Sequence, residues 1–284
     1  MEARVLATDL GFTEGPVFLR SGGMLVTSID RGHLYAIDED GSVRRLVNTG
    51  GGPNGATEGR AGCIYVAQNG GRGPGHRRAT VSGGIQNLHV DGRLEWVTKD
   101  LISPNDLCFG PDGFLYATDP TRSPARDDGR LWRVDVGTGD TELLTSVSWY
   151  PNGIGFAAED DCLYVASTGN SRIVRFPLSS SGLGKPEVAI QMEHGFPDGF
   201  AFDSAGNIVI AAVSFDDRPS DIQTWSLDGN LIDVFSPGVH HYYTNLAISA
   251  DRRLVITDSE GGAVLEVFDW PTSGLYLHPF RIPE

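Results

Sequence analysis

The chain repeats one short pattern six times, and this repeat restricts the possible folds more than any other feature. Each copy reads as an apolar strand that opens on a polar residue, followed by a turn and a second apolar strand such as CLYVAS. The opening residues lie 40 to 51 positions apart and are Glu14, Asn54, Asn105, Asn152, Asp198 and Asn245. A period of about 45 residues without helical patterning is typical of one four-stranded propeller blade per repeat.

The sequence therefore predicts an all-β protein, a six-bladed β-propeller with four antiparallel strands per blade. The segment ARVLATD at 3–9 precedes the first copy as the outer strands of the middle copies precede theirs. We expect this N-terminal strand to join the last blade, which closes the ring and protects its edges. No linker or shift in composition interrupts the repeats, which predicts a single domain over residues 1–284.

The charge of the chain limits its partners. There are 37 acidic and 22 basic residues, for a net charge of −15. Nucleic acids and anionic membranes bind basic surfaces, so neither is an expected partner. The N-terminus lacks the features of a signal peptide, and no apolar run approaches the roughly 18 residues of a membrane span, so we expect a cytoplasmic location. We therefore expect a small-molecule substrate as the binding partner, and a protein that is a monomer or a weak homo-oligomer.

The six opening residues indicate a metal site. The innermost strands of a propeller start at one end of the channel, so these two carboxylates and four amides converge there. Their hard oxygen atoms suit one divalent ion, Ca²⁺ first, with Mg²⁺ or Mn²⁺ also open. The alternative is that Asn and Asp before Gly only form turns. That alternative explains Glu14-Gly15-Pro16 poorly, because Glu is not a turn residue.

Four motifs resemble the regucalcin/gluconolactonase family, which includes luciferin-regenerating enzymes: TEGPVF at 13–18, SPNDLCFGPDGFLYATD at 103–119, YPNGIGF at 150–156 and FPDGFAFD at 196–203. The resemblance covers essentially the whole chain. It implies a six-bladed propeller with a divalent metal in the channel, for which Zn²⁺ and Fe²⁺ are further candidates.

The resemblance also implies roles for single residues. Glu14, Asn152 and Asp198 match direct metal ligands, and Asn105 matches a position that contacts metal or substrate. Ser103 stands where members that act on sugar lactones often carry an arginine. Recognition of a polyhydroxylated lactone by that arginine is therefore not expected here.

These observations predict a metal-dependent hydrolase that opens a lactone with activated water. Asp198 is the candidate general base, and a role in metal ligation alone stays open. Substrate contacts are expected from residues on the same face, namely Asn105, Ser103, Tyr150, Phe196, His241, Tyr243, Arg77 and Arg122. The two arginines lie on net basic loops, at 70–86 and 121–130, which form either a lid for an anionic substrate or an ordinary solvated surface.

Two other functions stay open. The same metal platform would serve hydrolysis of another ester or of a phosphoester-like electrophile. Alternatively, the chain is a Ca²⁺-binding or protein-interaction propeller without turnover. A scaffold of this kind would not need an acid at position 14.

Overall fold

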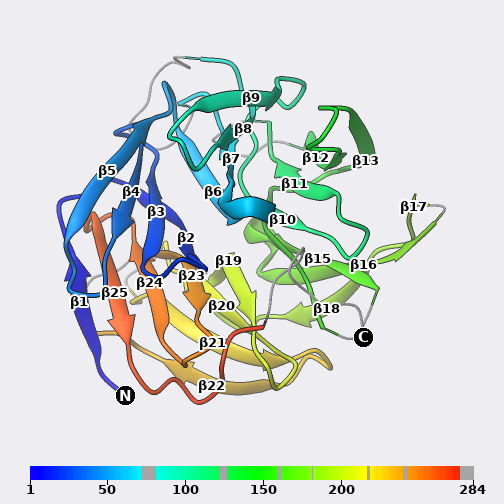
Figure 1. The fold of residues 1–284 in the computed structure, drawn as a ribbon. Coiled ribbons are helices and arrows are strands. Elements are labelled where there is room, and N and C mark those ends of the chain that lie inside the picture. Colours follow the sequence, from blue (N-terminus) through cyan, green and yellow to red (C-terminus); the bar gives the residue numbers. More distant parts are fainter. Residues whose placement is uncertain are drawn as a thin grey trace.

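In a computed structural model of the chain, six antiparallel sheets surround a central axis, as the repeat predicts (Figure 1). Within the described residues, the helical segments are the one-turn 3₁₀ helices η1 (Arg60–Gly62) and η2 (Thr168–Asn170), and none is long and apolar enough to cross a membrane. The structure describes residues 1–71, 81–121, 127–158, 161–180, 182–215, 218–238 and 242–275.

Each blade begins with its innermost strand and proceeds outward along the chain. Blades one to three contain β2 (Thr13–Phe18), β3 (Met24–Ser28), β4 (His33–Ile37) and β5 (Val43–Asn48); β6 (Pro53–Glu58), β7 (Ile64–Gln68), β8 (Gly84–Leu88) and β9 (Leu94–Thr98); and β10 (Leu107–Phe109), β11 (Leu115–Asp119), β12 (Gly129–Val134) and β13 (Thr141–Val147). Blades four to six contain β14 (Pro151–Phe156), β15 (Cys162–Ser167), β16 (Arg172–Ser179), β17 (Gly182–Leu183) and β18 (Glu187–Gln191); β19 (Phe196–Phe202), β20 (Asn207–Val213), β21 (Asp221–Ser226) and β22 (Leu231–Phe235); and β23 (Tyr243–Ile248), β24 (Leu254–Asp258), β25 (Ala263–Val267) and β1 (Ala3–Ala7).

Blade four departs from the four-strand pattern by one short strand. The two-residue strand β17 extends the hairpin at the end of β16, while β18 pairs with β16 in the usual outer position. The extra strand lies at the edge of the sheet, so it does not change the position of β14 at the axis.

The core lies between the blades. Six clusters of buried apolar side chains fill the six blade interfaces. At three interfaces, a tyrosine from the second strand of one blade meets the edge of a phenylalanine on the innermost strand of the next, with ring centroids 5.0 to 5.4 Å apart: Tyr65–Phe109, Tyr116–Phe156 and Tyr164–Phe202. The repeated tyrosine of CIYVA, FLYATD and CLYVAS is therefore the residue that joins neighbouring blades.

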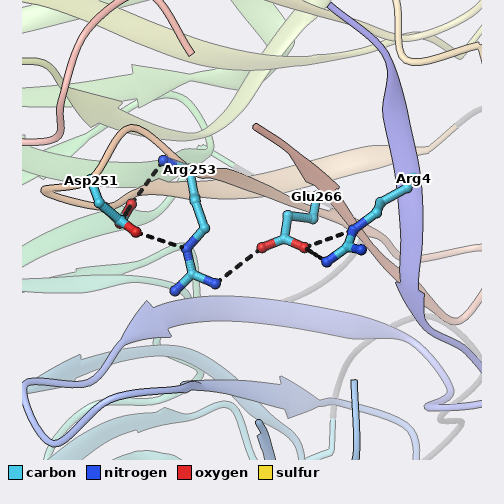
Figure 2. Close-up of polar contacts among 5 residues, drawn as sticks. Arg4, Asp251, Arg253 and Glu266 are labelled. Atoms are coloured by element: carbon cyan, nitrogen blue, oxygen red, sulfur yellow. Dashed lines mark hydrogen bonds and ion pairs between the residues drawn. The ribbon is translucent and has the colours of Figure 1, made fainter. Parts of the chain in front are cut away.

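The N-terminal strand closes the ring, as predicted. β1 pairs antiparallel with β25, and Figure 2 shows the ion pairs that accompany this pairing. The fully buried carboxylate of Glu266 accepts hydrogen bonds from Arg4 Nε and Nη2 at 3.0 and 2.7 Å, and from Arg253 Nη1 at 3.2 Å. One carboxylate thus links β1, β25 and the residue before β24.

Candidate metal centre

The polar residues that open the repeats all lie within two residues of the first residue of an innermost strand. In five blades, the antiparallel register of the innermost strand shifts at this residue or directly beside it. Such an irregularity redirects a side chain out of the regular alternation of the sheet. In blade three, β10 begins two residues after Asn105, whose backbone amide still donates to the carbonyl of Thr118 at 2.8 Å.

Hydroxyl groups of the preceding blade hold the backbone at these positions. Thr27 Oγ1 donates to the carbonyl of Asn54 at 2.6 Å, and Thr118 Oγ1 donates to that of Asn152 at 2.7 Å. The Thr168 hydroxyl donates in the same way to the carbonyl beside Asp198 at 2.8 Å. In the first and third blades this hydroxyl lies on the second strand, and in the fourth blade it lies on η2, directly after the second strand.

Glycine after the opening residue allows neighbouring strands to approach closely. A Cβ atom on Gly153 would lie 2.4 Å from the carbonyl oxygen of Asp198, and one on Gly199 would lie 2.1 Å from Asn245 Oδ1. In blade three this position is Asp106, whose carboxylate accepts a hydrogen bond from Leu107 N at 2.8 Å. A third carboxyl group thus enters the ring at a position that is glycine in blades one, two, four and five and leucine in blade six.

Three carboxyl groups gather at the channel, and within the described residues no cation contributes to the shifts of their pKa values. Burial raises the pKa of Glu14 to about 7, opposed by hydrogen bonds from Thr244 and Asn245, while the charge of Asp106 raises it further. Burial likewise raises the pKa of Asp106 to about 7. For Asp198, burial and then the charges of Glu14 and Asp106 raise the pKa well above its usual range, against a hydrogen bond from Asn152.

The amide side chains divide into two kinds. Asn245 has both ends in use, since Nδ2 donates to Glu14 Oε2 at 3.2 Å and Oδ1 accepts from Leu246 N at 2.8 Å. By contrast, Asn152 Nδ2 donates to Thr168 Oγ1 at 3.1 Å, and Asn105 Nδ2 lies 3.5 Å from Tyr150 Oη. With their Nδ2 atoms engaged in this way, Asn105 and Asn152 could act as ligands through their Oδ1 atoms, to which no described residue donates.

This donor set fits a hard divalent cation. The available ligands are carboxylate and amide oxygens, and a cation among them would favour the charged carboxylates that burial disfavours. Glu14 and Asn152 are buried, whereas Asp198 and Asn105 are half-buried. Within the described part of the chain, no group of three or more His, Cys, Asp or Glu side chains has the arrangement of a metal site. Any site here therefore depends on the asparagines as well as the acids.

The remaining predicted substrate contacts lie in different surroundings. Tyr150 is half-buried beside Asn105; burial, and then the charges of Asp198 and Glu14, raise the pKa of its hydroxyl, so the group remains protonated. Ser103 is buried, and its hydroxyl donates to the carbonyl of Asn69 at 3.2 Å. Arg77, Arg122 and His241 lie outside the described residues.

Phe196 and Tyr243 are both at the starts of innermost strands but face different neighbours. Phe196 is half-buried and borders a cleft of about 200 Å³ whose lining is otherwise largely polar, including His194, Arg218 and Asp221. Tyr243 is only 1% exposed and packs in the apolar cluster between blades five and six. The pKa of its neighbour Tyr242 is raised, first by burial of the hydroxyl and then by the charge of Asp198.

Two residues near the site carried no clear signal in the sequence. Tyr242 belongs to the run HHYY, where strand alternation decides which tyrosine faces the core. Phe215 lies on the connection between β20 and β21, and its ring stands between those of Phe196 and Tyr242. Contacts between such segments depend on the tertiary fold rather than on any local pattern.

Comparison with known proteins gives consistent results. The family model described as "SMP-30/Gluconolactonase/LRE-like region" matches residues 12–260. A gluconolactonase of Zymomonas mobilis is 26% identical over 270 residues, covering 82% of this chain and 71% of that protein. Two further curated relatives are matched over only 35% and 32% of their own length.

Two solved structures show the same fold. Regucalcin of Agrobacterium tumefaciens, a calcium-binding protein, superposes with a TM-score of 0.81 at 20% identity, covering 99% of this chain and 97% of that one. A gluconolactonase of Xanthomonas campestris superposes with a TM-score of 0.78 at 19% identity, covering 96% and 89%. At these identities, the likeness concerns the fold alone.

Proposed function

Since this chain belongs to the SMP-30/gluconolactonase/LRE-like family, as its motifs predicted, we propose that it is a divalent-metal-dependent hydrolase that opens a lactone. The observation that carries the proposal is the convergence of Glu14, Asn152 and Asp198 with Asn105 at one end of the channel. Among the residues that the structure describes, no cation contributes to the raised pKa values of Glu14 and Asp198. Glu14, Asn152 and Asp198 would hold the ion, with Asn105 as a fourth ligand or a substrate contact. The name of the Agrobacterium relative supports Ca²⁺ as the first choice of ion, with Mg²⁺, Mn²⁺, Zn²⁺ and Fe²⁺ open.

When bound, such an ion polarises an ester carbonyl and lowers the pKa of a nearby water molecule. Asp198 is half-buried at the edge of the ring, where it would accept a proton from the attacking water. The water oxygen forms a bond to the carbonyl carbon, the ring C–O bond breaks, and the proton passes to the alkoxide. Ligation without proton transfer is the alternative role for Asp198.

Tyr150 is proposed to orient the substrate. Its hydroxyl lies 3.5 Å from Asn105 Nδ2 and, because its pKa is raised, it keeps the proton that it would donate to a substrate oxygen. Arg77 and Arg122 are proposed to attract an acidic substrate, a prediction from the sequence alone. The cytoplasmic location and the monomeric or weakly oligomeric state also stay predictions.

The test combines a substrate panel with a metal panel. The protein is stripped with a chelator and assayed on lactones, carboxylic esters and phosphoesters, with each of the five ions added separately. We expect lactone hydrolysis that is lost with the chelator and restored by at least one ion. A preference for phosphoesters would favour the second hydrolase function, while metal binding without turnover of any substrate would favour the non-catalytic propeller.

Variants of Asp198 separate its two roles. Asp198→Asn retains an oxygen ligand and removes the base. If Asp198 is the base, this variant lowers kcat by about 10²- to 10⁴-fold even at saturating metal. If Asp198 is a ligand only, the same variant loses metal affinity, and excess metal restores kcat. Asp233→Asn, at an exposed position on the outer strand β22, is the matched control and leaves both quantities unchanged.

A further inference from the structure

Three aromatic rings contact one another in a row, one pair tilted and the other edge to face, near the carboxyl groups of the channel. The centroids of Phe196 and Phe215 are 5.1 Å apart, and those of Phe215 and Tyr242 are 5.6 Å apart. The rings come from three separate segments: the first residue of β19, the connection after β20, and the residue before β23. We call these three residues the aromatic wall.

The aromatic wall stands beside the candidate metal centre. Phe196 precedes Asp198 by two residues on the same strand, and β19 and β23 are neighbours around the axis (Figure 1). The charge of Asp198 acts on the hydroxyl of Tyr242, which agrees with this placement. A substrate whose ester group lies at the carboxyl groups would therefore extend one side toward the aromatic wall.

The central ring of the wall is open to solvent. Phe215 is 59% exposed, although it contacts an aromatic ring on each side. A single exposed phenylalanine is ordinary on a protein surface. Here, however, the exposed ring contacts Phe196, which lies two residues from Asp198, so it offers apolar surface close to the candidate metal centre.

The aromatic wall offers few hydrogen-bond partners for the hydroxyl groups of a sugar. Many hydroxyl groups would need hydrogen-bond partners, whereas the wall presents ring faces and a single tyrosine hydroxyl. Ser103, which occupies the position of the sugar-associated arginine, has its hydroxyl committed to the carbonyl of Asn69. The cleft on the other side of Phe196 is largely polar, so the surface that matches an apolar group is that of the three rings.

We propose that the substrate is a lactone with an alkyl or aryl substituent on its ring, and that the aromatic wall binds this substituent. This inference rests on the proposed lactonase function and specifies its substrate class. Each methylene that enters the wall should lower KM by about fourfold, since burying one contributes roughly 0.8 kcal/mol. The gain should end once the chain extends beyond Phe215.

The kinetic test uses γ-lactones with no side chain and with side chains of two, five and seven carbons, together with glucono-δ-lactone. For the wild type, kcat/KM should rise with chain length and exceed that for the sugar lactone. Phe215→Ala should lower kcat/KM for the long-chain lactones about fivefold or more, and clearly more than for γ-butyrolactone. The substituent would cover the exposed 59% of this residue, and complete burial of a phenylalanine contributes roughly 1.5–3 kcal/mol. Phe268→Ala is the matched control, since that ring is 46% exposed and packs under Arg4, outside the wall.

A binding measurement keeps the proposal testable if no lactone is hydrolysed. Five-membered lactams with the same alkyl side chains are titrated calorimetrically into the metal-loaded protein. Affinity that rises with chain length in the wild type and not in Phe215→Ala supports the aromatic wall even where the lactonase proposal has failed. Hydrolysis without dependence on chain length, or equal effects of Phe215→Ala on all lactones, would overturn the wall and leave the lactonase standing.

Discussion

Removal of the Glu266 carboxylate should weaken the closure of the ring more than loss of an exposed ion pair does. Glu266 is fully buried and pairs with Arg4, whose side chain is 55% exposed, and with Arg253, whose side chain is 14% exposed (Figure 2). In Glu266→Ala, the nearest remaining carboxylate to Arg253 is the exposed Asp251, at 3.4 Å from Nε. Breaking a buried pair in this way typically costs about 3–5 kcal/mol.

We therefore expect Glu266→Ala to lower the free energy of unfolding by about 3 kcal/mol, a large part of the roughly 5–15 kcal/mol of a typical protein. At about 2–4 °C for each kcal/mol, the midpoint of thermal unfolding should fall by roughly 6–12 °C. Arg4→Ala should cost less, about 1 kcal/mol or below, because its side chain is largely exposed.

Urea unfolding followed by tryptophan fluorescence measures these differences. The control is Glu187→Ala, which removes an exposed ion pair with Arg175 in blade four and should cost at most about 1 kcal/mol. If Glu266→Ala and Glu187→Ala agree within about 0.5 kcal/mol, the reasoning is refuted and the buried pair does not stabilise the closure.

Three further predictions concern the channel. Gly199→Ala places a Cβ atom 2.1 Å from Asn245 Oδ1 of the next blade, so it should weaken metal binding in calorimetry and lower thermal stability. The control is Gly169→Ala, whose Cβ atom would have no neighbour within 4 Å and which should change neither quantity. In thermal unfolding with a chelator, the metal-free protein should be less stable at pH 8 than at pH 5. The pKa values of Glu14 and Asp106 are raised in the folded state, so their contribution to stability is complete below about pH 4 and is lost as the pH rises through 7. Equal midpoints at the two pH values would contradict this. Tyr150→Phe should lower kcat by about 10²-fold without changing metal affinity in calorimetry, and a loss of metal affinity would instead make Tyr150 a structural residue.

Much of the architecture was predictable because it repeats. The spacing of the opening residues, the paired apolar strands and the N-terminal strand predicted six blades and their closure, which the structure confirms. The motif tyrosines and phenylalanines recur for a physical reason that the structure supplies: Tyr116 and Phe156, for example, meet edge to face across a blade interface.

The details of the site were less predictable. Tyr243 was expected near the substrate, which stays a prediction; its side chain is 1% exposed in the apolar cluster between blades five and six, and the charge of Asp198 acts on its neighbour Tyr242. Asp106 replaces a glycine of the repeat and adds a third carboxyl group to the site. AVLEV at 263–267 reads as an ordinary apolar strand, and nothing local shows that its glutamate pairs with two arginines.

The sequence by itself determined the number of blades, the order of their strands and the polar residues at the channel, because all of these follow from a local pattern repeated along the chain. Only the tertiary structure decided which side chains meet. The aromatic wall joins positions 196, 215 and 242, and Glu266 joins positions 4 and 253. Such contacts depend on the closing of the ring and on shifts in strand register, which bring distant residues together without any periodic signal.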